Sequence, residues 1–161
     1  MTPTISKNKN FYCIGLSYLK ADATMRGMFS LIPENKEALL TQARSEGFEE
    51  LLVISTCNRT ELYGYADHPF QLIQLLCEYS KGSVDDFQKV GYVNKGKEAV
   101  QHLFEVGTGL NSQILGDFEI IGQMKQAFAL SRDKGLANAF LERLMNSVIN
   151  ASKRIKNETV L

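Results

Sequence analysis

The sequence lacks several features that would indicate particular classes of protein. It has only three cysteines, which are irregularly spaced and form no Cys-x-x-Cys pair: Cys13, Cys57 and Cys77. This pattern argues against a disulfide framework or a zinc site and is typical of a reducing compartment. No apolar stretch approaches membrane-spanning length, and residues 2–10 lack the apolar core of a signal peptide. We therefore expect a soluble, cytoplasmic protein with no bound metal and no membrane partner.

The sequence also has no excess of charge. Lys plus Arg and Asp plus Glu number 18 each, so the formal net charge is zero. A protein that binds nucleic acid mainly through charge is expected to be basic, so any contact with a polyanion would use a local patch. Lys153, Arg154 and Lys156 form such a cluster, although the end of a helix favours cations in any case. The length of 161 residues is sufficient for one domain with a real core.

The order of apolar and polar stretches predicts an α+β fold. The expected strands are residues 11–17, 51–55, 61–66 and 88–93. The expected helices are residues 23–30, 33–44, 70–80, 96–106, 118–132 and 138–157. Pro33 opens the second helix and Gly47 follows its end, as helix boundaries favour. This order predicts a ferredoxin-like βαββαβ sheet with helices on one face, followed by C-terminal helices.

The polar stretch Ser-Thr-Cys-Asn-Arg-Thr-Glu, residues 55–61, separates two expected strands and has Cys57 at its middle. Short connections on a rigid sheet often display reactive groups, and a cation such as Arg59 favours the reactive thiolate. One interpretation is a nucleophile; the other is a polar hairpin loop with an incidental cysteine. His102 flanks the apolar stripe of a helix, where a histidine is either a catalytic group or a structural hydrogen-bonding residue.

Several blocks of the sequence, in matching order, resemble glutamyl-tRNA reductase. They are Gly15-Leu16 with Ala21 and Arg26, the active-site-like stretch 55–61, the run from His102 to Gln123, and Lys153-Arg154 with Glu158-Thr159. The likeness covers residues 11–159, a catalytic domain preceded by an expected disordered lead-in at residues 1–10. Agreement across several blocks is far more specific than one motif.

The resemblance implies that the Cys57 thiolate attacks the ester carbonyl of glutamyl-tRNA and forms a glutamyl thioester. Hydride from NADPH would then release glutamate-1-semialdehyde, at the entry to tetrapyrrole biosynthesis. A thiolate is a strong nucleophile, and a covalent intermediate splits one hard step into two. The resemblance also implies a homodimer in the full-length enzyme and channelling of the product to the next enzyme of the pathway.

By the same resemblance, the catalytic residues are Cys57 and His102. The substrate-binding residues are Thr56, Asn58, Arg59, Ser112, Asp117, Phe118, Glu119 and Gln123. Arg59 suits a substrate carboxylate, because a guanidinium can hold a carboxylate bidentately. The chain departs from the family at residues 116–119, where Gly-Glu-Pro-Gln is usual, so an acid, Glu119, replaces a neutral amide. It departs again at residues 17–19, where Ser-Tyr-Leu stands for Asn-His-Lys.

A nicotinamide-binding domain would carry a Gly-x-Gly-x-x-Gly turn, and this sequence has none. We therefore expect the chain to comprise the catalytic domain alone, with the NADPH-binding and dimerisation domains absent from it. Such a domain is expected to form the thioester or hydrolyse the ester, but not to complete the reduction. Two alternatives stay open: a non-catalytic module that binds glutamyl-tRNA or a partner protein, and a different acyltransferase or hydrolase that uses Cys57 with His102.

Overall fold

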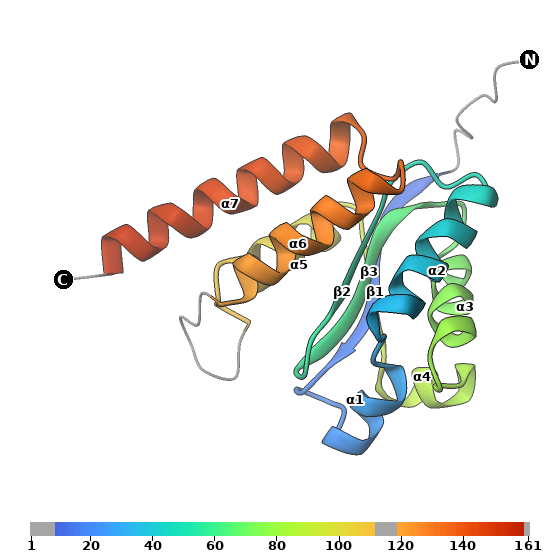
Figure 1. The fold of residues 1–161 in the computed structure, drawn as a ribbon. Helices are drawn as coiled ribbons and strands as arrows, with labels where there is room; N and C mark the ends of the chain where they lie inside the picture. The colour runs from blue at the N-terminus through green and yellow to red at the C-terminus, as the bar shows by residue number, and fades with distance from the viewer. Residues whose placement is uncertain (1–8, 112–118, 160–161) are drawn as a thin grey trace, which may run out of the picture.

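The computed structural model describes residues 9–111 and 119–159, and these residues contain every element named here (Figure 1). The strands are β1 (Asn10–Ser17), β2 (Leu51–Ser55), β3 (Arg59–Ala66) and β4 (Tyr92–Lys95). The helices are α1 (Ala23–Phe29), α2 (Pro33–Ser45), α3 (Pro69–Tyr79), α4 (Val84–Val90), α5 (Lys97–Gly107), α6 (Glu119–Asp133) and α7 (Ala139–Thr159). The prediction of an α+β fold is confirmed.

The four strands form one sheet in the order β2-β3-β1-β4, and every neighbouring pair is antiparallel. In the central pair, Gly15 of β1 lies opposite Glu61 of β3. A Cβ atom at Gly15 would lie 2.4 Å from the carbonyl oxygen of Thr60 and 2.8 Å from Cγ of Glu61. A glycine in a strand often marks such a close approach, and here it makes room for the side chain of Glu61.

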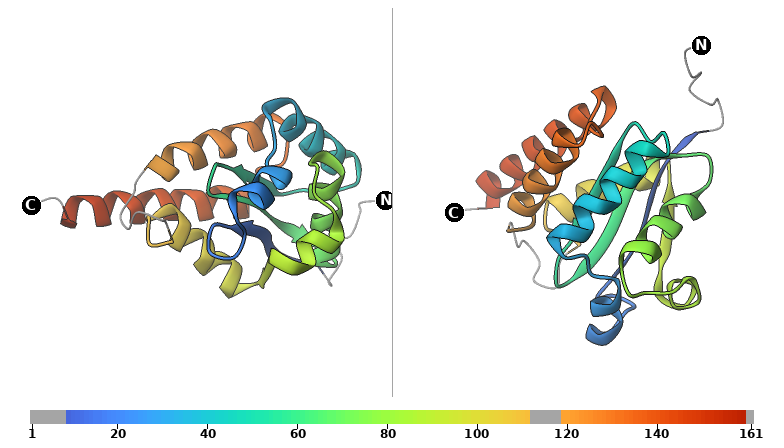
Figure 2. Two further views of the ribbon diagram at one scale, coloured as in Figure 1. Left: turned by 90° about the horizontal axis from the view of Figure 1, so that it is seen from below. Right: turned by 45° about the vertical axis from the view of Figure 1, so that its right-hand side comes forward.

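Helices cover both faces of the sheet (Figures 1 and 2). On one face, α2 and α3 pack over residues that include Ile14 and Leu62. On the other face, α5, α6 and α7 pack over residues that include Cys13 and Tyr63. Successive residues of a strand point to opposite faces, so strands buried on both faces are apolar almost throughout. The helices that we expected to follow the sheet therefore cover its second face, and the expectation of helices on one face alone does not describe the whole chain.

Residues at the ends of α2 behave as the sequence predicts. Pro33 is the first residue of the helix, where its missing N–H costs nothing. Gly47 follows the C-terminal end with a φ angle of 94°, and the N–H of Phe48 donates to the carbonyl of Ala43 over 3.0 Å. This positive φ is the conformation that favours glycine after a helix.

The strand expected at residues 88–93 is wrong over most of its length. Residues up to Val90 belong to α4, and β4 begins only at Tyr92. Ser83 caps α4, because its Oγ accepts a hydrogen bond from the N–H of Asp86 over 3.1 Å. Asp85 and Asp86 also place negative charge in the first turn, where the helix dipole favours it. These capping signals outweigh the short β-like run.

The third strand begins earlier than expected, at Arg59 instead of Glu61. The loop between β2 and β3 is therefore residues 56–58 only, and three polar residues of the motif belong to a buried strand. Of the expected lead-in, residues 1–8 lie outside the described residues, and Asn10 is the first residue of β1. Among the helices described, none combines the length and apolarity needed to cross a bilayer.

Candidate active site

Cys57 is exposed at the tip of the β2–β3 hairpin. The loop around it is fixed by local hydrogen bonds. Thr56 Oγ1 accepts from the N–H groups of Asn58 and Arg59 over 3.1 and 3.3 Å, and the N–H of Thr56 donates to the carbonyl of Arg59 over 2.8 Å. The carbonyl of Asn58 accepts from the N–H of Tyr18 over 2.9 Å. The thiol is therefore presented by a tight turn that is anchored to the end of β1.

Arg26 of α1 provides a second anchor for the loop. Its Nε donates to the carbonyl oxygen of Cys57 over 3.0 Å, and its Nη1 donates to the carbonyl of Ala21 over 2.7 Å. The guanidinium thus joins α1 to the backbone of the candidate nucleophile and places a positive charge beside it. Arg26 resembles the family at the sequence level, but its contact with Cys57 depends on the packing of α1 against β3.

The side chain of Arg59 is buried, with 3% of its surface exposed. Its Nη1 donates to Glu61 Oε2 over 3.4 Å, and its Nη2 donates to Asn111 Oδ1 over 3.2 Å and to the carbonyl oxygen of Asn111. A guanidinium has five N–H donors, and within the described residues these contacts leave the donor on Nε and one on Nη1. Asn111 immediately precedes residues 112–118, which lie outside the described residues.

Glu61 is completely buried and accepts hydrogen bonds from four side chains. They are Arg59, Tyr63, Tyr92 and His102; the distance from Tyr63 Oη to Glu61 Oε1 is 2.9 Å, and both Tyr92 Oη and His102 Nε2 contact Oε2. We call these five residues the Glu61 cluster. Burial alone would raise the pKa of Glu61, but the hydrogen bond and charge of His102 and the charge of Arg59 lower it overall. Glu61 is therefore a buried carboxylate.

The two tyrosines of the Glu61 cluster remain protonated donors. Burial raises the pKa of Tyr92 far above its ordinary value, and the negative charge of Glu61 adds to the effect. Burial also raises the pKa of Tyr63, with a further contribution from Cys13 and Glu61. Both phenols therefore keep their protons and donate hydrogen bonds to the carboxylate of Glu61.

His102 connects α5 to the sheet. Its ring packs against Tyr92 with centroids 5.2 Å apart, while Nε2 contacts Glu61 Oε2. About 15% of its side-chain surface is exposed. Within the described residues, no hydrogen bond joins His102 to Cys57. Because an ionised carboxylate can only accept, Nε2 of His102 is the donor in this contact, which fixes the orientation of the ring.

Cys13, Glu61 and His102 place one potential metal-ligand atom each within 4.8 Å of one another. The arrangement nevertheless fits a hydrogen-bonded cluster better than a metal site. The carboxylate already accepts from four donors, one of which is the cation Arg59. Burial raises the pKa of the Cys13 thiol well above its ordinary value, which disfavours the thiolate that would bind a metal.

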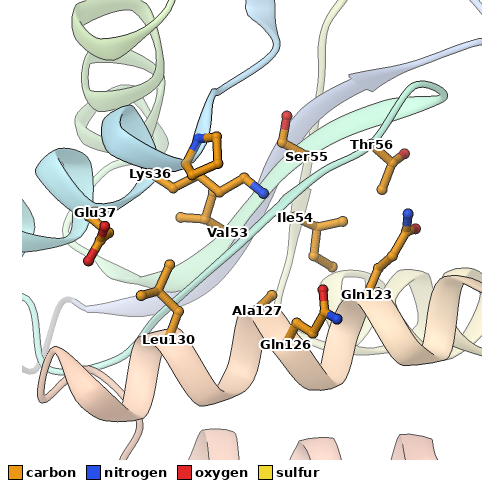
Figure 3. Close-up of a pocket in the computed structure, with 11 residues that line it drawn as sticks. Lys36, Glu37, Val53, Ile54, Ser55, Thr56, Gln123, Gln126, Ala127 and Leu130 are labelled. Carbon is orange, nitrogen blue, oxygen red and sulfur yellow. The ribbon is translucent and has the colours of Figure 1, made fainter.

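A groove lies along the edge of the sheet between α2 and α6, next to the Cys57 loop (Figure 3). We call it the α2–α6 groove; its volume is about 420 Å³. Its lining residues are Pro33, Lys36, Glu37, Val53, Ile54, Ser55, Thr56, Gln123, Gln126, Ala127 and Leu130. Two of the expected substrate-binding residues, Thr56 and Gln123, meet at one end of it (Figure 3).

The remaining expected site residues lie away from this groove or outside the described part of the chain. Glu119 is the first residue of α6 and is exposed. Ser112, Asp117 and Phe118 lie outside the described residues. The structure thus brings Thr56 and Gln123 together at the groove, and it joins Arg59 to His102 through Glu61.

Comparisons with known proteins give the family of the chain. The sequence model described as "Glutamyl-tRNAGlu reductase, N-terminal domain" matches residues 14–159. The chain belongs to this family. A protein named glutamyl-tRNA reductase from Christiangramia forsetii is 66% identical over 155 residues, which are 96% of this chain and 37% of the relative. One from Flavobacterium psychrophilum is 65% identical over 156 residues, covering 97% of this chain and 38% of the relative.

The fold of this domain is also found in a solved structure. The glutamyl-tRNA reductase from Methanopyrus kandleri aligns with a TM-score of 0.78 at 26% sequence identity, over 92% of this chain and 35% of that one. The chain spans little more than a third of the length of its relatives. The activity, substrate and partners of a whole protein are therefore proposals for this chain.

The sequence predicts no role for Glu61, Tyr63, Tyr92 or Arg26, although the structure brings them into or beside the site. Glu61 ends the motif and is the first residue of the strand expected at residues 61–66, but its polarity there predicts no partner by itself. A sharper signal was available in the alternation of the strand: Arg59, Glu61 and Tyr63 share one face of β3, because their spacing is two residues.

Proposed function

We propose that this domain forms a glutamyl thioester on Cys57 from glutamyl-tRNA, within a protein that reduces the thioester to glutamate-1-semialdehyde for tetrapyrrole biosynthesis. The observation that carries the proposal is the exposed thiol at the tip of a hairpin whose backbone is held from both sides by Arg26 and Tyr18. A fixed nucleophile lowers the entropic cost of attack on a bound ester.

In the proposed step, the thiolate sulfur of Cys57 attacks the carbonyl carbon that joins glutamate to the terminal ribose. The carbon–sulfur bond forms, the carbon–oxygen bond breaks, and the ribose oxygen leaves with a proton. His102 is the described residue suited to handle a proton or to orient the substrate, as the resemblance implies. Its contact with Glu61 supports a fixed ring orientation for either role.

We propose that the substrate's glutamyl group is bound by Thr56, Asn58, Arg59, Glu119 and Gln123, together with Ser112, Asp117 and Phe118. The position of Thr56 and Gln123 at one end of the α2–α6 groove supports this assignment. Arg59 retains N–H donors for a carboxylate, and its contact with Asn111 supports a site that continues into residues 112–118.

NADPH would supply the hydride for the reduction when it is bound elsewhere in the protein. The described residues do not fit a dinucleotide: every strand pair is antiparallel, whereas a dinucleotide fold needs parallel strands and a glycine-rich turn before a helix. We therefore place NADPH outside this domain. We also propose a cytoplasmic homodimer that passes its product to the next enzyme, and a ferredoxin-like topology for the sheet, which its strand order supports.

The test is intact-mass measurement after incubation with glutamyl-tRNA in the absence of NADPH and quenching in acid. We expect one glutamyl adduct on the wild type and none on Cys57→Ser. Cys77→Ser is the matched control, because it makes the same change at a half-buried cysteine of α3 and should keep the adduct. An adduct that persists in Cys57→Ser, or the absence of both adduct and released glutamate under rapid quench, would contradict the proposal.

A further inference from the structure

The α2–α6 groove runs along the free edge of β2. Residues of an antiparallel strand alternate between backbone groups that bond the neighbouring strand and backbone groups that point away from it. The backbone groups of Leu51 point away from β3: its N–H donates to the carbonyl of Leu136 over 2.9 Å, and its carbonyl accepts from Ser131 Oγ over 2.7 Å. By the same alternation, the backbone groups of Val53 and Ser55 point away from β3 and toward the groove.

Val53 and Ser55 both line the groove. Within the described residues, their outward N–H and C=O groups form no backbone hydrogen bond outside the strand. A strand edge of this kind can form two hydrogen bonds with a ligand that carries a donor and an acceptor side by side, because the N–H and C=O of one residue point in the same direction. The groove therefore contains two adjacent sites for planar, bidentate hydrogen bonding.

The walls of the groove suit a small amphipathic ligand. Ala127 and Leu130 of α6 supply apolar surface, and Gln126 lies beside them (Figure 3). On the opposite wall, α2 places the positive charge of Lys36 and the negative charge of Glu37, which is paired with Lys134 over 3.5 Å. A volume of about 420 Å³ lies within the range of small-molecule sites. The groove is thus large enough for a nucleoside.

The groove also lies at the right place relative to the candidate nucleophile. Thr56 closes one end of it, next to Cys57, and Ser55, the last residue of β2, precedes Cys57 by two residues, at most about 7 Å of chain. A group attached to the ester oxygen of a substrate whose carbonyl is at Cys57 would therefore reach the backbone of Ser55.

We propose that the α2–α6 groove binds the 3′-terminal adenosine of the aminoacyl-tRNA, an inference that rests on the proposed function. Adenine presents a donor and an acceptor on adjacent atoms, which match the outward C=O and N–H of Ser55 or Val53. Its faces pack on the apolar wall formed by Ala127 and Leu130, and Lys36 attracts the 5′ phosphate. A peptide strand fits this edge less well, because Leu51 is already paired and, of the described residues of β2, only two stay open.

The experiment compares two acyl donors on the same variants. Glutamyl-tRNA carries the adenosine, whereas the α-methyl thioester of glutamate acylates a cysteine by thiol exchange and lacks it. Gln126→Trp fills the groove from an exposed position, and Ala129→Trp is the matched control on the outer surface of the same helix. We expect Gln126→Trp to slow acylation by subsaturating glutamyl-tRNA about tenfold and to leave acylation by the methyl thioester unchanged. Ala129→Trp should change neither rate.

Competition provides an independent measurement. Adenosine 5′-monophosphate should inhibit acylation of the wild type by glutamyl-tRNA competitively, while ribose 5-phosphate, which lacks the base, should not. If Gln126→Trp fails to fold, as circular dichroism would show, Lys36→Glu takes its place with the same expected selectivity.

Three outcomes separate the two proposals. If neither donor acylates the wild type, the proposed function is wrong. The groove proposal is still tested in that case by binding of adenosine 5′-monophosphate, measured by chemical-shift mapping of β2 and α6. Absence of this binding would overturn the groove proposal. Acylation by glutamyl-tRNA at an unchanged rate in Gln126→Trp overturns the groove proposal alone. If the rate in Gln126→Trp is unchanged and adenosine 5′-monophosphate does not inhibit the wild type, the groove proposal is wrong, and the free edge of β2 would then be assigned to binding of a peptide strand.

Discussion

Arg26 donates from Nε to the carbonyl oxygen of Cys57 over 3.0 Å, and the same guanidinium donates to Ala21 over 2.7 Å. The candidate nucleophile is therefore fixed by a residue of the first helix as well as by its own hairpin. Two donors in a rigid plane can join two carbonyl groups at once, which a lysine ammonium on a flexible stem does less well.

We expect Arg26→Lys to slow thioester formation about tenfold, the equivalent of one hydrogen bond of about 1–1.5 kcal/mol. The positive charge is retained in this variant, so the loss would measure the positioning of the loop. Single-turnover acylation by glutamyl-tRNA gives the rate. Arg44→Lys, an exposed change in α2, is the control. An Arg26→Lys rate equal to that of the wild type would show that charge alone matters at this position.

Glu61 links stability to pH. Its pKa is lowered in the folded state from an ordinary value of 4.5, because the contacts with His102, Arg59 and Tyr92 outweigh the effect of burial. The folded state thus binds its proton less readily than the unfolded state, and stability rises with pH in this region. The contribution is fully present above about pH 4.5 and is lost as the pH falls through the folded-state pKa.

Glu61→Gln should remove this part of the pH dependence and lower the free energy of unfolding at pH 7 by about 3–5 kcal/mol, since it leaves Arg59 buried without its counter-charge. Urea denaturation from pH 3 to 7 measures both effects. Glu37→Gln, an exposed change on α2, should retain the slope of the wild type. A Glu61→Gln variant with the same acid sensitivity as the wild type would show that other carboxylates are responsible.

The fold was largely predictable from the sequence, because it depends on local patterns. The apolar strands at 11–17 and 51–55, the helix boundaries at Pro33 and Gly47, and the long amphipathic C-terminal helices all correspond to elements of the structure. The segment around residue 88 was less predictable, since a short helix and a strand compete there. Its outcome depends on the cap formed by Ser83 and on burial of Phe87.

The candidate site was predictable only in part. Cys57 stands out from its motif, but the Glu61 cluster does not, because three of its members come from the same face of β3 while Tyr92 and His102 come from β4 and α5. Polar residues in the interior of a strand also contradict the usual apolar pattern. They are tolerated because each finds partners across elements, and no single stretch of sequence carries that information.

His102 contacts Glu61, so a structural role of His102 can be measured as stability, separately from a catalytic role measured as the rate of acylation. We expect His102→Asn to lower the free energy of unfolding by about 1–3 kcal/mol, because Glu61 loses a buried donor. A double-mutant cycle with Glu61→Gln should give a coupling energy of about 1–3 kcal/mol. If His102 also handles a proton of the substrate, single-turnover acylation will fall in fully folded His102→Asn. A normal rate in the folded variant would assign His102 to structure alone.

Gly15 leaves the space that the side chain of Glu61 occupies. It lies opposite Glu61 in the β1–β3 pair, and a Cβ at this position would meet the Thr60 carbonyl at 2.4 Å and Glu61 Cγ at 2.8 Å. The first neighbour is backbone of a central strand, so neither strand can yield without disturbing the register. We expect Gly15→Ala to lower the free energy of unfolding by about 1–3 kcal/mol and to slow acylation of Cys57.

Gly122 of α6 provides the matched control for Gly15→Ala. A Cβ there would meet nothing within 4 Å, so Gly122→Ala should raise stability by about 0.5–1 kcal/mol through its better helix propensity. Thermal and urea denaturation measure both variants. Because Gly15 contacts Glu61 directly, the loss in Gly15→Ala should shrink when Glu61 is already replaced by Gln. An undiminished loss would locate the strain in the strand backbone at Thr60 instead of in the Glu61 side chain.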